Sequence, residues 1–288
     1  MNLINVAALV DGKLIDIDAN VTPMEDRGYQ FGDGVYEVTR VYNGQCFMFK
    51  PHMNRLFRSL AELNIDFHYS GDDLQGFHEL LIKESGIMEG TVYLQVTRGV
   101  APREHGFPKK ISSRLTMFAR SIKDQSMLRK VGSKGIFVPD IRWLRCDIKS
   151  LNLLGNVIAK EQASQVGCYE AIQFRENGIV TEGSSSNFWA VKDQTLYTHQ
   201  ATNLILKGIA RTLIADRLAP KLGIAVVEQE FDQNFVFGCD EAFVCGTTTE
   251  IMPIIQIDDR KIGDGAVGVI SKKLQVAYLK AIQEECYS

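Results

Sequence analysis

A lysine in an apolar setting is the first candidate for chemistry in this chain. Lys149 lies in the segment RCDIKSLNLLGNVIAK, residues 145–160. If the start of this segment is extended, Asp147 and Lys149 share one face and Cys146 and Ile148 share the other, because side chains alternate along a strand. The plain interpretation is a solvated surface lysine. The alternative is an amine drawn out of water, which can attack an aldehyde or ketone and form a Schiff base.

A carboxylate followed by hydroxyl groups is the second candidate. The segment VTEGSSSNFW, residues 180–189, carries Glu182 directly before a glycine and three serines. A turn between two strands, in which hydroxyls satisfy backbone groups, explains this composition without any function. A carboxylate that faces a protonated ring nitrogen explains it too, because a pyridoxal phosphate enzyme needs such a partner to keep the ring electron-accepting. Both interpretations stay open on this segment alone.

Three features can hold a phosphate group. LKGIAR, residues 206–211, opens a helical pattern, and the N–H groups at a helix start attract anions. CGTTTE, residues 245–250, offers a glycine and three hydroxyls between two strand patterns, which suits an anion nest. Arg55 lies on the helical pattern after Pro51 and can make a two-pronged phosphate contact. Glycine and threonine at such positions also occur for packing reasons alone.

A proline-stiffened loop carries several cations. TRGVAPREHGFP, residues 97–108, contains Arg98, Arg103 and His105 among two glycines and two prolines. A charged loop is often only a solvated surface. Neighbouring cations on a stiff loop would also trap a carboxylate, to which arginine donates two parallel hydrogen bonds.

The hydrophobic pattern predicts the elements that position these groups. Turn signals at Asp11-Gly12 and Asn43-Gly44 predict two hairpins, the first between residues 6–10 and 14–17. Helical spacing predicts helices, and apolar runs predict strands, over the following ranges: helices at 51–63, 72–84, 151–166, 208–222 and 267–284, strands at 91–97, 114–119 and 135–145. Strands and helices do not strictly alternate, which favours an α+β fold over a doubly wound sheet.

The chain is long enough for two domains of ordinary size. It has 288 residues, of which 45% are hydrophobic. Residues 121–130 are polar and lack a period, which predicts a linker there. We therefore expect an N-terminal domain at residues 1–120 and a C-terminal domain at residues 131–288, the latter carrying Lys149.

Charge and composition exclude several classes of protein. The net charge is -3 and no basic block occurs, which argues against a nucleic-acid partner. The start lacks the pattern of a signal peptide, and no run of about 18 apolar residues predicts a membrane span. Six cysteines form no CxxC pair and five histidines form no HExxH, so no metal site is expected. Free thiols predict a cytoplasmic protein.

Seven segments in this order resemble one family. They are EDRGYQFGDGVYEV, HMNRL, TRGVAPREHGFP, IRWLRCDIKSLNLLGN, TEGSSSN, LKGIAR and GTTTEI, and they extend from about residue 25 to 258. Together they resemble the D-amino acid aminotransferases, which belong to the fold-type IV pyridoxal phosphate enzymes with the branched-chain aminotransferases and aminodeoxychorismate lyase. The resemblance implies a two-domain α+β architecture with the active site between the domains. It also implies pyridoxal 5'-phosphate as cofactor and a homodimer.

The resemblance assigns cofactor roles to candidate residues. Lys149 matches the lysine that forms the Schiff base and shuttles the substrate proton, and Glu182 matches the carboxylate that faces the pyridine nitrogen. Arg55 matches the arginine on the cofactor phosphate, and Leu206 matches a residue that packs against the cofactor ring. Further phosphate contacts are implied for Ile209, Ala210 and Thr247.

The resemblance also assigns the substrate side. Tyr36 matches the tyrosine that lines the substrate pocket, and Arg103 and His105 match a carboxylate trap delivered across the dimer interface. The implied reaction is a ping-pong transfer of an amino group from a D-amino acid, typically D-alanine, to a 2-oxo acid, typically 2-oxoglutarate, giving pyruvate and D-glutamate. A branched-chain L-amino acid aminotransferase and an aminodeoxychorismate lyase of the same fold are the alternatives.

Two positions depart from the pattern of the family. Ala210 stands where a threonine is expected in close relatives, and Gly246 stands where a serine is common near the phosphate. Either change would loosen phosphate binding, and neither touches the chemistry.

Overall fold

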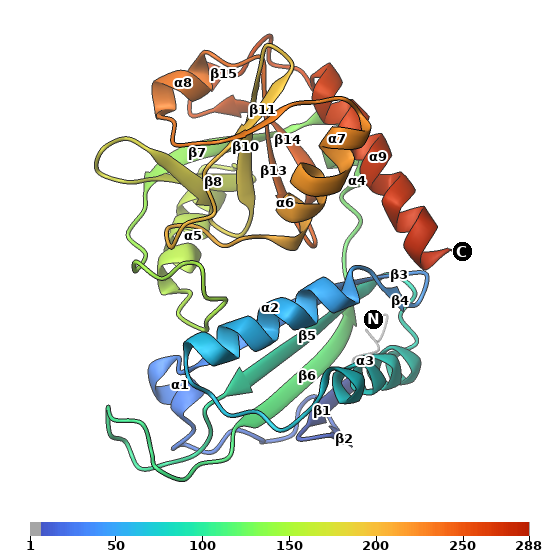
Figure 1. Ribbon diagram of the computed structural model, residues 1–288, viewed down its shortest axis with the longest axis vertical. Coiled ribbons are helices and arrows are strands. Elements are labelled where there is room, and N and C mark those ends of the chain that lie inside the picture. Colours follow the sequence, from blue (N-terminus) through green and yellow to red (C-terminus); the bar gives the residue numbers. More distant parts are fainter. Residues whose placement is uncertain (1–6, 288) are drawn as a thin grey trace. The chain divides into compact units, whose positions relative to one another are not determined.

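The chain forms two compact units. The computed structural model describes residues 7–287, so residues 1–6, which include the start of the first predicted hairpin, lie outside the described residues (Figure 1). The first unit contains the residues up to Lys123 together with Ile148–Asn152 and the segment from Ile282. The second unit contains Asp124–Asp147 and Leu153–Ala281.

Lys149 belongs to the first unit, whereas the sequence pattern placed it in the C-terminal domain. The physical reason is that the backbone of Lys149 and Leu151 hydrogen-bonds to the start of β3, a strand of the first unit at Gly34–Tyr42. Consequently the predicted helix 151–166 begins only at Leu154. Within the predicted linker at 121–130, a short helix α4 spans Ser126–Val131.

The first unit is built on an antiparallel sheet with the strand order β2-β1-β6-β5-β3-β4. Neighbouring strands in it pair antiparallel throughout. Its strands are β1 Ala7–Val10, β2 Lys13–Ile15, β3 Gly34–Tyr42, β4 Gln45–Cys46, β5 Gly90–Thr97 and β6 Arg114–Ser121. Both predicted hairpins are therefore confirmed, and their turns place Asp11 and Asn43 at positive φ, as tight turns of this kind require.

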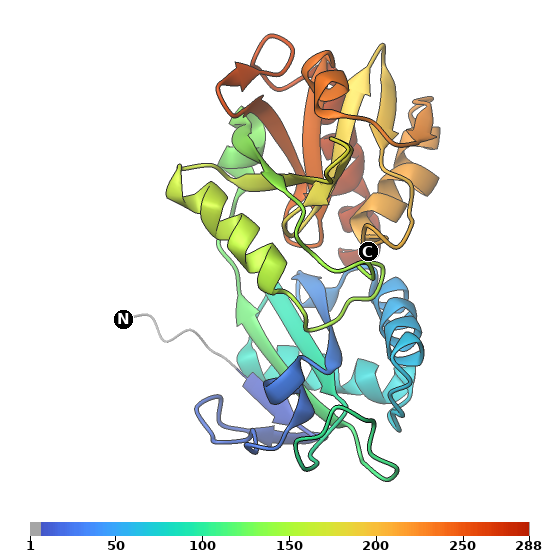
Figure 2. The ribbon, with the colours of Figure 1, turned by 90° about the vertical axis from the view of Figure 1, so that its left-hand side faces the viewer.

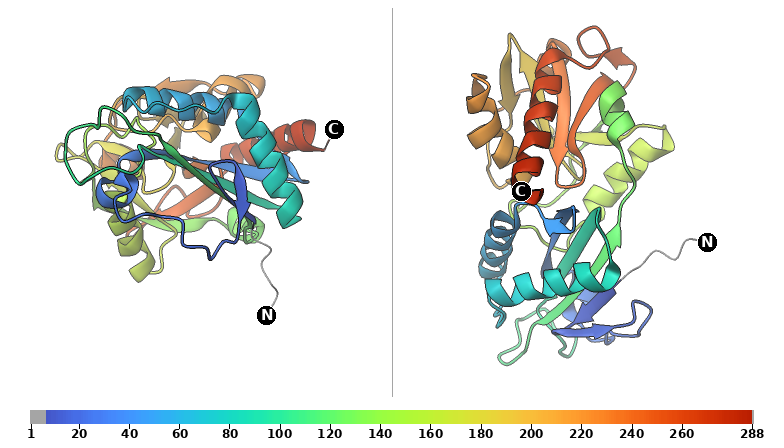
Figure 3. Two further views of the ribbon diagram at one scale, coloured as in Figure 1. Left: turned by 90° about the horizontal axis from the view of Figure 1, so that it is seen from below. Right: turned by 90° about the vertical axis from the view of Figure 1, so that its right-hand side faces the viewer.

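Two helices cover one face of this sheet. They are α2, Phe49–Glu62, and α3, Gly71–Ser85, and α1 is a short helix at Arg27–Phe31 (Figures 1 and 3). The apolar side chains of α2 and α3, among them Leu56 and Leu74, pack with the inward side chains of the strands in one core. Because side chains alternate along β3, residue 37 also points toward the helices, and that position is occupied by a glutamate.

The second unit is built on a mixed sheet with the strand order β12-β11-β10-β13-β14-β7-β8-β9, and β15 pairs with β14. The pairs β11–β12, β14–β7 and β7–β8 are parallel. Its strands are β7 Ser133–Pro139, β8 Glu170–Phe174, β9 Val180–Gly183, β10 Asn187–Lys192, β11 Thr195–Thr198, β12 Val226–Glu228, β13 Glu241–Gly246, β14 Glu250–Ile257 and β15 Arg260–Lys261.

The strand predicted at 135–145 is correct only as far as Pro139. Beyond it the Arg142 N–H donates to Asp140 Oδ1 at 3.1 Å, a local side-chain turn that ends the strand. Strands β7 and β8 are covered by α5, Leu154–Gln165, whose Ala159 and Ala163 pack onto Val138 and Ala171 (Figure 2).

The helix predicted at 208–222 is present but not uniform. It consists of α6 Ile209–Leu213, a π-helical stretch at Ile214–Leu218 and α7 Ala219–Lys221. Pro220 has no N–H for the bond to residue 216, and the wider turns before it accommodate that missing donor. A further short helix, α8, spans Gln233–Phe237.

The last helix, α9, spans Val269–Cys286 and follows a glycine-rich run, GDGAVG at residues 263–268. Its first N–H groups, those of Ile270 and Ser271, each donate to a carboxylate oxygen of Glu241 at 2.8 Å. This end of the helix is thus already occupied by an anion of the chain itself. Among the described residues, no helix is both long and apolar enough to cross a membrane.

Candidate active site

Lys149 lies on a short segment whose backbone hydrogen-bonds to the start of β3. The Tyr36 N–H donates to the Lys149 carbonyl at 3.0 Å, and the Leu151 N–H donates to the Gly34 carbonyl at 3.0 Å. On the helix side, the Lys149 N–H donates to the Ser59 hydroxyl of α2 at 3.3 Å. The backbone of the lysine is therefore held from two directions by the first unit.

The side chain of Lys149 lies over an aromatic ring. Its Nζ is 4.2 Å from the centroid of the Tyr36 ring, which fits a cation–π contact. Tyr36 in turn stacks on Tyr93, with ring centroids 5.8 Å apart. Lys149 is half-buried, and both Ile148 and Cys146 are buried. Cys146 and Asp147 lie in a turn, so the extended conformation considered from the sequence is not formed there. The structure thus brings Lys149 and Tyr36 together.

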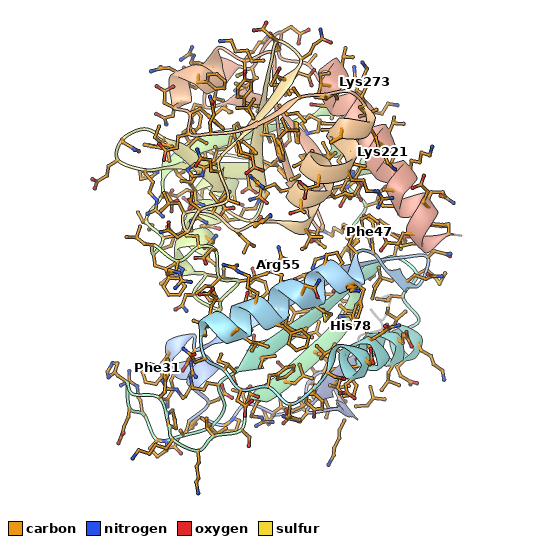
Figure 4. The ribbon with its side chains drawn as sticks, in the orientation of Figure 1. Phe31, Phe47, Arg55, His78, Lys221 and Lys273 are labelled. Atoms are coloured by element: carbon orange, nitrogen blue, oxygen red, sulfur yellow. The ribbon has the colours of Figure 1, made fainter. Side chains whose placement is uncertain are left out.

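A buried carboxylate, which the sequence reasoning did not single out, binds Arg55. Arg55 Nε donates to Glu37 Oε1 at 2.7 Å, and Nη2 donates to Oε2 at 2.9 Å. His52 Nδ1 lies 2.8 Å from the same Oε2. Figure 4 labels Arg55 on α2, one turn along from His52. The predicted phosphate arginine is therefore fixed to β3 by a two-pronged ion pair.

Ionisation of Glu37 is strongly favoured despite its burial. The side chain is fully buried, which by itself raises the pKa of a carboxyl group. The Arg55 guanidinium and the bond from His52 outweigh that effect and hold the pKa of Glu37 well below its ordinary value. For His52, burial outweighs the neighbouring carboxylate and lowers the pKa of the ring. Glu37 is thus a permanent anion in the physiological range.

The proposed trap residues Arg103 and His105 lie on an exposed loop of the first unit. The Arg103 guanidinium is 4.9 Å from the ring centroid of Phe31, and the His105 ring is 5.6 Å from the same ring. The structure therefore brings the two residues together around one aromatic side chain. Figure 4 labels Phe31 at the end of α1.

In the second unit, Glu182 of β9 receives hydrogen bonds on both oxygens. Arg142 Nη1 donates to Oε1 at 2.5 Å, and Asn187 Nδ2 donates to Oε2 at 2.8 Å. The Leu206 N–H is 3.2 Å from each oxygen. Glu182 is 5% exposed, so its orientation is set by three protein donors rather than by water.

The charge on Glu182 is only partly compensated. Arg142 also donates from Nε and Nη2 to Asp140, at 2.9 and 2.7 Å, so one guanidinium serves two carboxylates. Burial raises the pKa of Glu182, and the attraction of Arg142 does not fully cancel this effect. The pKa of Asp140 is lowered, because Arg142, Thr181 and Arg175 together outweigh its burial. Glu182 is therefore the carboxylate that gains most from a further cation.

Asn187 ties Glu182 to the turn that starts α6. Besides its bond to Glu182, Asn187 Nδ2 donates to the Leu206 carbonyl at 2.8 Å. A Cβ atom on Gly208 would lie 2.0 Å from Asn187 Oδ1, so only glycine fits there. The next residues, Ile209 and Ala210, are buried at the first turn of α6. The N–H groups predicted to bind the phosphate therefore belong to residues that directly follow the turn bonded to Asn187, which also binds Glu182.

Thr247 lies in the turn between β13 and β14, and α6 packs against β13. A Cβ atom on Gly246 would meet its nearest neighbours at 3.6 Å, which is ordinary contact. The end of β13 therefore has room for a Cβ atom at position 246. Leu206, Ile209, Ala210 and Thr247 are all in the second unit with Glu182, whereas Lys149, Tyr36, Arg55, Arg103 and His105 are in the first.

Comparison with known proteins identifies the family. The family model for class IV amino-transferases matches residues 34–257. A D-alanine aminotransferase of Staphylococcus epidermidis is 42% identical over 275 residues, which cover 95% of this chain and 97% of that protein. The D-alanine aminotransferase of Listeria monocytogenes is 44% identical over 281 residues, 96% of each chain, and that of Bacillus licheniformis is 40% identical over 277 residues, 96% of this chain and 97% of that one.

The chain belongs to the class IV aminotransferases. It is therefore an enzyme that transfers amino groups, as the resemblance implied. Solved structures confirm the fold. A branched-chain aminotransferase of Thermoproteus uzoniensis, solved with norvaline, has a TM-score of 0.85 and 26% identity, covering 98% of this chain and 96% of that one. The branched-chain enzyme of Escherichia coli has a TM-score of 0.88 at 23% identity, with 95% and 93% covered. The expected fold-type IV α+β architecture is thus borne out.

Sequence reasoning missed three residues of this aminotransferase that hold its candidate site. Glu37 was visible as a carboxylate at an inward position of an apolar strand. Arg142 and Asn187 lie in IRWLR and TEGSSSN, two segments that carried the resemblance without a role for these side chains. None could be paired from spacing, because their partners are 18, 40 and 5 residues away in the chain.

Proposed function

We propose that this class IV aminotransferase is a pyridoxal phosphate-dependent D-amino acid transaminase. It transfers the amino group of D-alanine to 2-oxoglutarate and yields pyruvate and D-glutamate in a ping-pong sequence. The observation that carries the proposal is the 40–44% identity to D-alanine aminotransferases over nearly the whole chain. The structural neighbours at lower identity support the fold and leave the substrate to those relatives.

The residues present fit the cofactor. Glu182 is buried, is held by Arg142, Asn187 and the Leu206 N–H, and has a raised pKa, so a protonated ring nitrogen would supply the missing positive charge. Pyridoxal phosphate, when bound, supplies an electron-accepting ring that stabilises negative charge at the substrate α-carbon. A branched-chain aminotransferase structure is described in its holo form with this cofactor, and another was solved with pyridoxamine 5'-phosphate.

The phosphate end is assigned to backbone and hydroxyl donors. The first turn of α6 presents the N–H groups of Ile209 and Ala210, and Thr247 adds a hydroxyl from the β13–β14 turn. Arg55 is assigned the charged contact to the phosphate, held ready by its ion pair with Glu37. Leu206 is assigned to the cofactor ring, because its N–H already binds Glu182.

Lys149 is assigned the covalent attachment of the cofactor and the movement of the substrate α-proton. Its Nζ lies over the Tyr36 ring, which restricts where the amine can point. Once substrate frees this amine, it acts as the general base that takes the α-proton and returns it. Arg103 and His105 are assigned the substrate carboxylate, so that only one enantiomer turns its α-hydrogen toward the lysine.

The direct test is a comparison of substrates. We expect pyruvate to form from D-alanine with 2-oxoglutarate, and no turnover of L-alanine or L-valine. The Lys149→Ala variant should lose turnover by a factor on the order of 10³ or more, because the nucleophile and the base disappear together. Turnover of L-valine with none of D-alanine would contradict the proposal and favour the branched-chain L-specific alternative.

We further propose a homodimer in which Arg103 and His105 serve the site of the other subunit. Both side chains are exposed in this chain, as that role requires. Lys149→Ala and Arg103→Ala protomers, each of low activity alone, should regain activity when mixed dimers form. Half of the dimers are then mixed and one site of each is intact, so about a quarter of wild-type activity is expected. No recovery would show that the trap acts within its own subunit.

A further inference from the structure

We propose that Arg27 and Phe31 are positioning residues that hold the Arg103/His105 loop in its working shape. The motif EDRGYQFGDG, residues 25–34, is prominent in the sequence, yet the proposed function uses only Tyr36, just beyond it. In the structure this motif forms α1 and its flanks. Its side chains and backbone make the contacts that fix the loop at residues 99–111. This inference rests on the proposed role of Arg103 and His105.

The guanidinium of Arg27 binds backbone carbonyl groups of the loop. Its side chain is 3% exposed, and its Nη1 donates to the Glu104 carbonyl at 2.6 Å and Nη2 to the His105 carbonyl at 3.5 Å. Glu104 is the residue between Arg103 and His105, so the guanidinium fixes the backbone at the centre of the pair. Burying a charged guanidinium costs free energy, and a loop that is only a solvated surface does not require such a contact.

Asp33 binds Arg27 and also binds a second arginine, Arg98, which contacts the same loop. Asp33 Oδ2 accepts from Arg27 Nε and from Arg98 Nε, each at 2.8 Å. Arg98 also lies over the Phe107 ring, 3.6 Å from its centroid. One carboxylate therefore anchors two arginines that hold the loop at residues 104–105 and at residue 107.

Phe31 contacts two arginines and the histidine of the loop. Its ring centroid is 4.8 Å from the Arg27 guanidinium, 4.9 Å from the Arg103 guanidinium and 5.6 Å from the His105 ring. An aromatic ring attracts a guanidinium group and packs against an imidazole ring, and both contacts restrict side-chain rotamers. Arg103 and His105 are exposed and would otherwise lose side-chain entropy on binding a carboxylate. The ring thus orders both side chains before substrate arrives.

The backbone of the motif closes the base of the loop. The Arg27 N–H donates to the Gly99 carbonyl at 2.9 Å, and Asp26 forms an antiparallel bridge with Val100. Gly99 has φ 113°, and a Cβ atom there would lie 2.1 Å from the Ser112 carbonyl oxygen. The loop therefore leaves and re-enters the sheet in one defined geometry.

The test measures KM and kcat separately in the holoenzyme. Phe31→Leu should raise KM for D-alanine and for 2-oxoglutarate about tenfold while kcat changes less, because the loss falls on ordering of the carboxylate trap. Phe31→Tyr keeps the aromatic ring, so its KM should stay near the wild-type value.

Arg27→Lys keeps the positive charge but cannot donate to both the Glu104 and the His105 carbonyl in the same way. It should therefore raise KM as Phe31→Leu does, and it should speed tryptic cleavage after Arg103. Tyr29→Leu is the control, since that side chain is on the same helix and is 74% exposed.

A double-mutant cycle separates this inference from the proposed function. In an Arg103→Ala background, Phe31→Leu should no longer change KM, because the ring has lost the group it orders. If Arg103→Ala itself leaves KM unchanged, the trap assignment in the proposed function fails. If Arg103→Ala raises KM but Phe31→Leu and Arg27→Lys do not, the trap stands and the positioning role is overturned. Equal KM values for Phe31→Leu and Phe31→Tyr, both raised, would overturn it as well.

Discussion

A buried glutamate bonded to an arginine lies at the candidate site in each unit, Glu37 in the first and Glu182 in the second, and these two carboxylates differ in charge balance. Glu37 of the first unit accepts two hydrogen bonds from the Arg55 guanidinium, and it also bonds to His52. Glu182 of the second unit shares Arg142 with Asp140. As a result, the pKa of Glu37 is lowered and the pKa of Glu182 is raised, although both are almost fully buried.

This difference separates a structural carboxylate from a functional one. A carboxylate with a complete set of partners fixes its arginine and has little to gain from a ligand. A carboxylate that shares its arginine with a second carboxylate stays available for a cationic ligand, and its burial strengthens that interaction. Perturbed carboxylates of this second kind are typical of functional sites. We therefore assign Glu37 to the position of Arg55 and Glu182 to the cofactor.

The largest expected effect is on turnover at Glu182. Glu182→Gln keeps the size of the side chain but removes the negative charge, so a cationic ring nitrogen is no longer stabilised. Turnover of D-alanine should fall by about 10²–10³-fold, the range seen when a preorganised electrostatic partner is removed. Steady-state kcat at saturating cofactor measures this loss. A decrease of less than tenfold would mean that Glu182, like Glu37, has a structural role and not a catalytic one.

The next effect is on stability at Glu37. Glu37→Gln leaves the Arg55 guanidinium buried without its counter-charge, and breaking a buried pair in this way costs about 3–5 kcal/mol. The matched control is Glu62→Gln, because Glu62 pairs with Arg58 on α2 and the two side chains are 38% and 45% exposed. Pairs exposed in this way contribute about 0–1 kcal/mol. Urea unfolding of the two variants provides the comparison. Equal losses would mean that burial of the Glu37 pair is not decisive.

A smaller effect is expected from Gly208→Ala. The new Cβ would collide with Asn187 Oδ1 and displace the amide that supports Glu182. Affinity for pyridoxal phosphate should fall about tenfold, which corresponds to about 1.4 kcal/mol. Gly76→Ala is the control, because nothing lies within 4 Å of its added Cβ and alanine favours helix α3. Fluorescence titration of each cofactor-free variant with pyridoxal phosphate measures its affinity. Unchanged affinity in Gly208→Ala would show that the position of Asn187 does not affect cofactor binding at Glu182.

The smallest effect is a shift in pH dependence. Asn187→Ala removes one donor from the ionised form of Glu182, so the already raised pKa of Glu182 should rise further. Binding of a cationic ring requires the ionised carboxylate, so the acid limb of cofactor affinity against pH should move upward by roughly half a unit to one unit. A downward shift would mean that Asn187 stabilises the protonated form instead.

The sequence was sufficient for the fold class. Hairpin signals at Asp11 and Asn43, and the helical spacing around Leu56, depend on neighbours in the chain and were predicted correctly. The seven segments were sufficient for the family. What could not be predicted depends on distant partners: the pairing of residues 148–152 with β3, which moves Lys149 to the first unit, and the division of Arg142 between Glu182 and Asp140. The roles of the individual site residues stay predictions until the variants are measured.

The sign of the stability change at the two glutamates tests the comparison most directly. The folded pKa of Glu37 is depressed, so its contribution is present above the unfolded value of about 4.3 and is lost only in strong acid. The folded pKa of Glu182 is raised, so its contribution is present at low pH and is lost as the pH rises through the folded pKa. At pH 8 the charge of Glu182 therefore opposes folding of the cofactor-free protein, whereas the charge of Glu37 supports it.

The measurement is the apparent thermal unfolding midpoint of cofactor-free wild type, Glu37→Gln and Glu182→Gln at pH 8. We expect Glu37→Gln to unfold at a lower temperature than wild type, because Arg55 loses the carboxylate that it binds. We expect Glu182→Gln to unfold at a higher temperature, because the unfavourable charge is removed while Arg142 keeps its two bonds to Asp140. Saturation with pyridoxal phosphate should then reverse the order of Glu182→Gln and wild type, since only the wild type gains the bond to the ring nitrogen. Destabilisation by both substitutions without cofactor would contradict the account, because Glu182 would then be as fully compensated as Glu37.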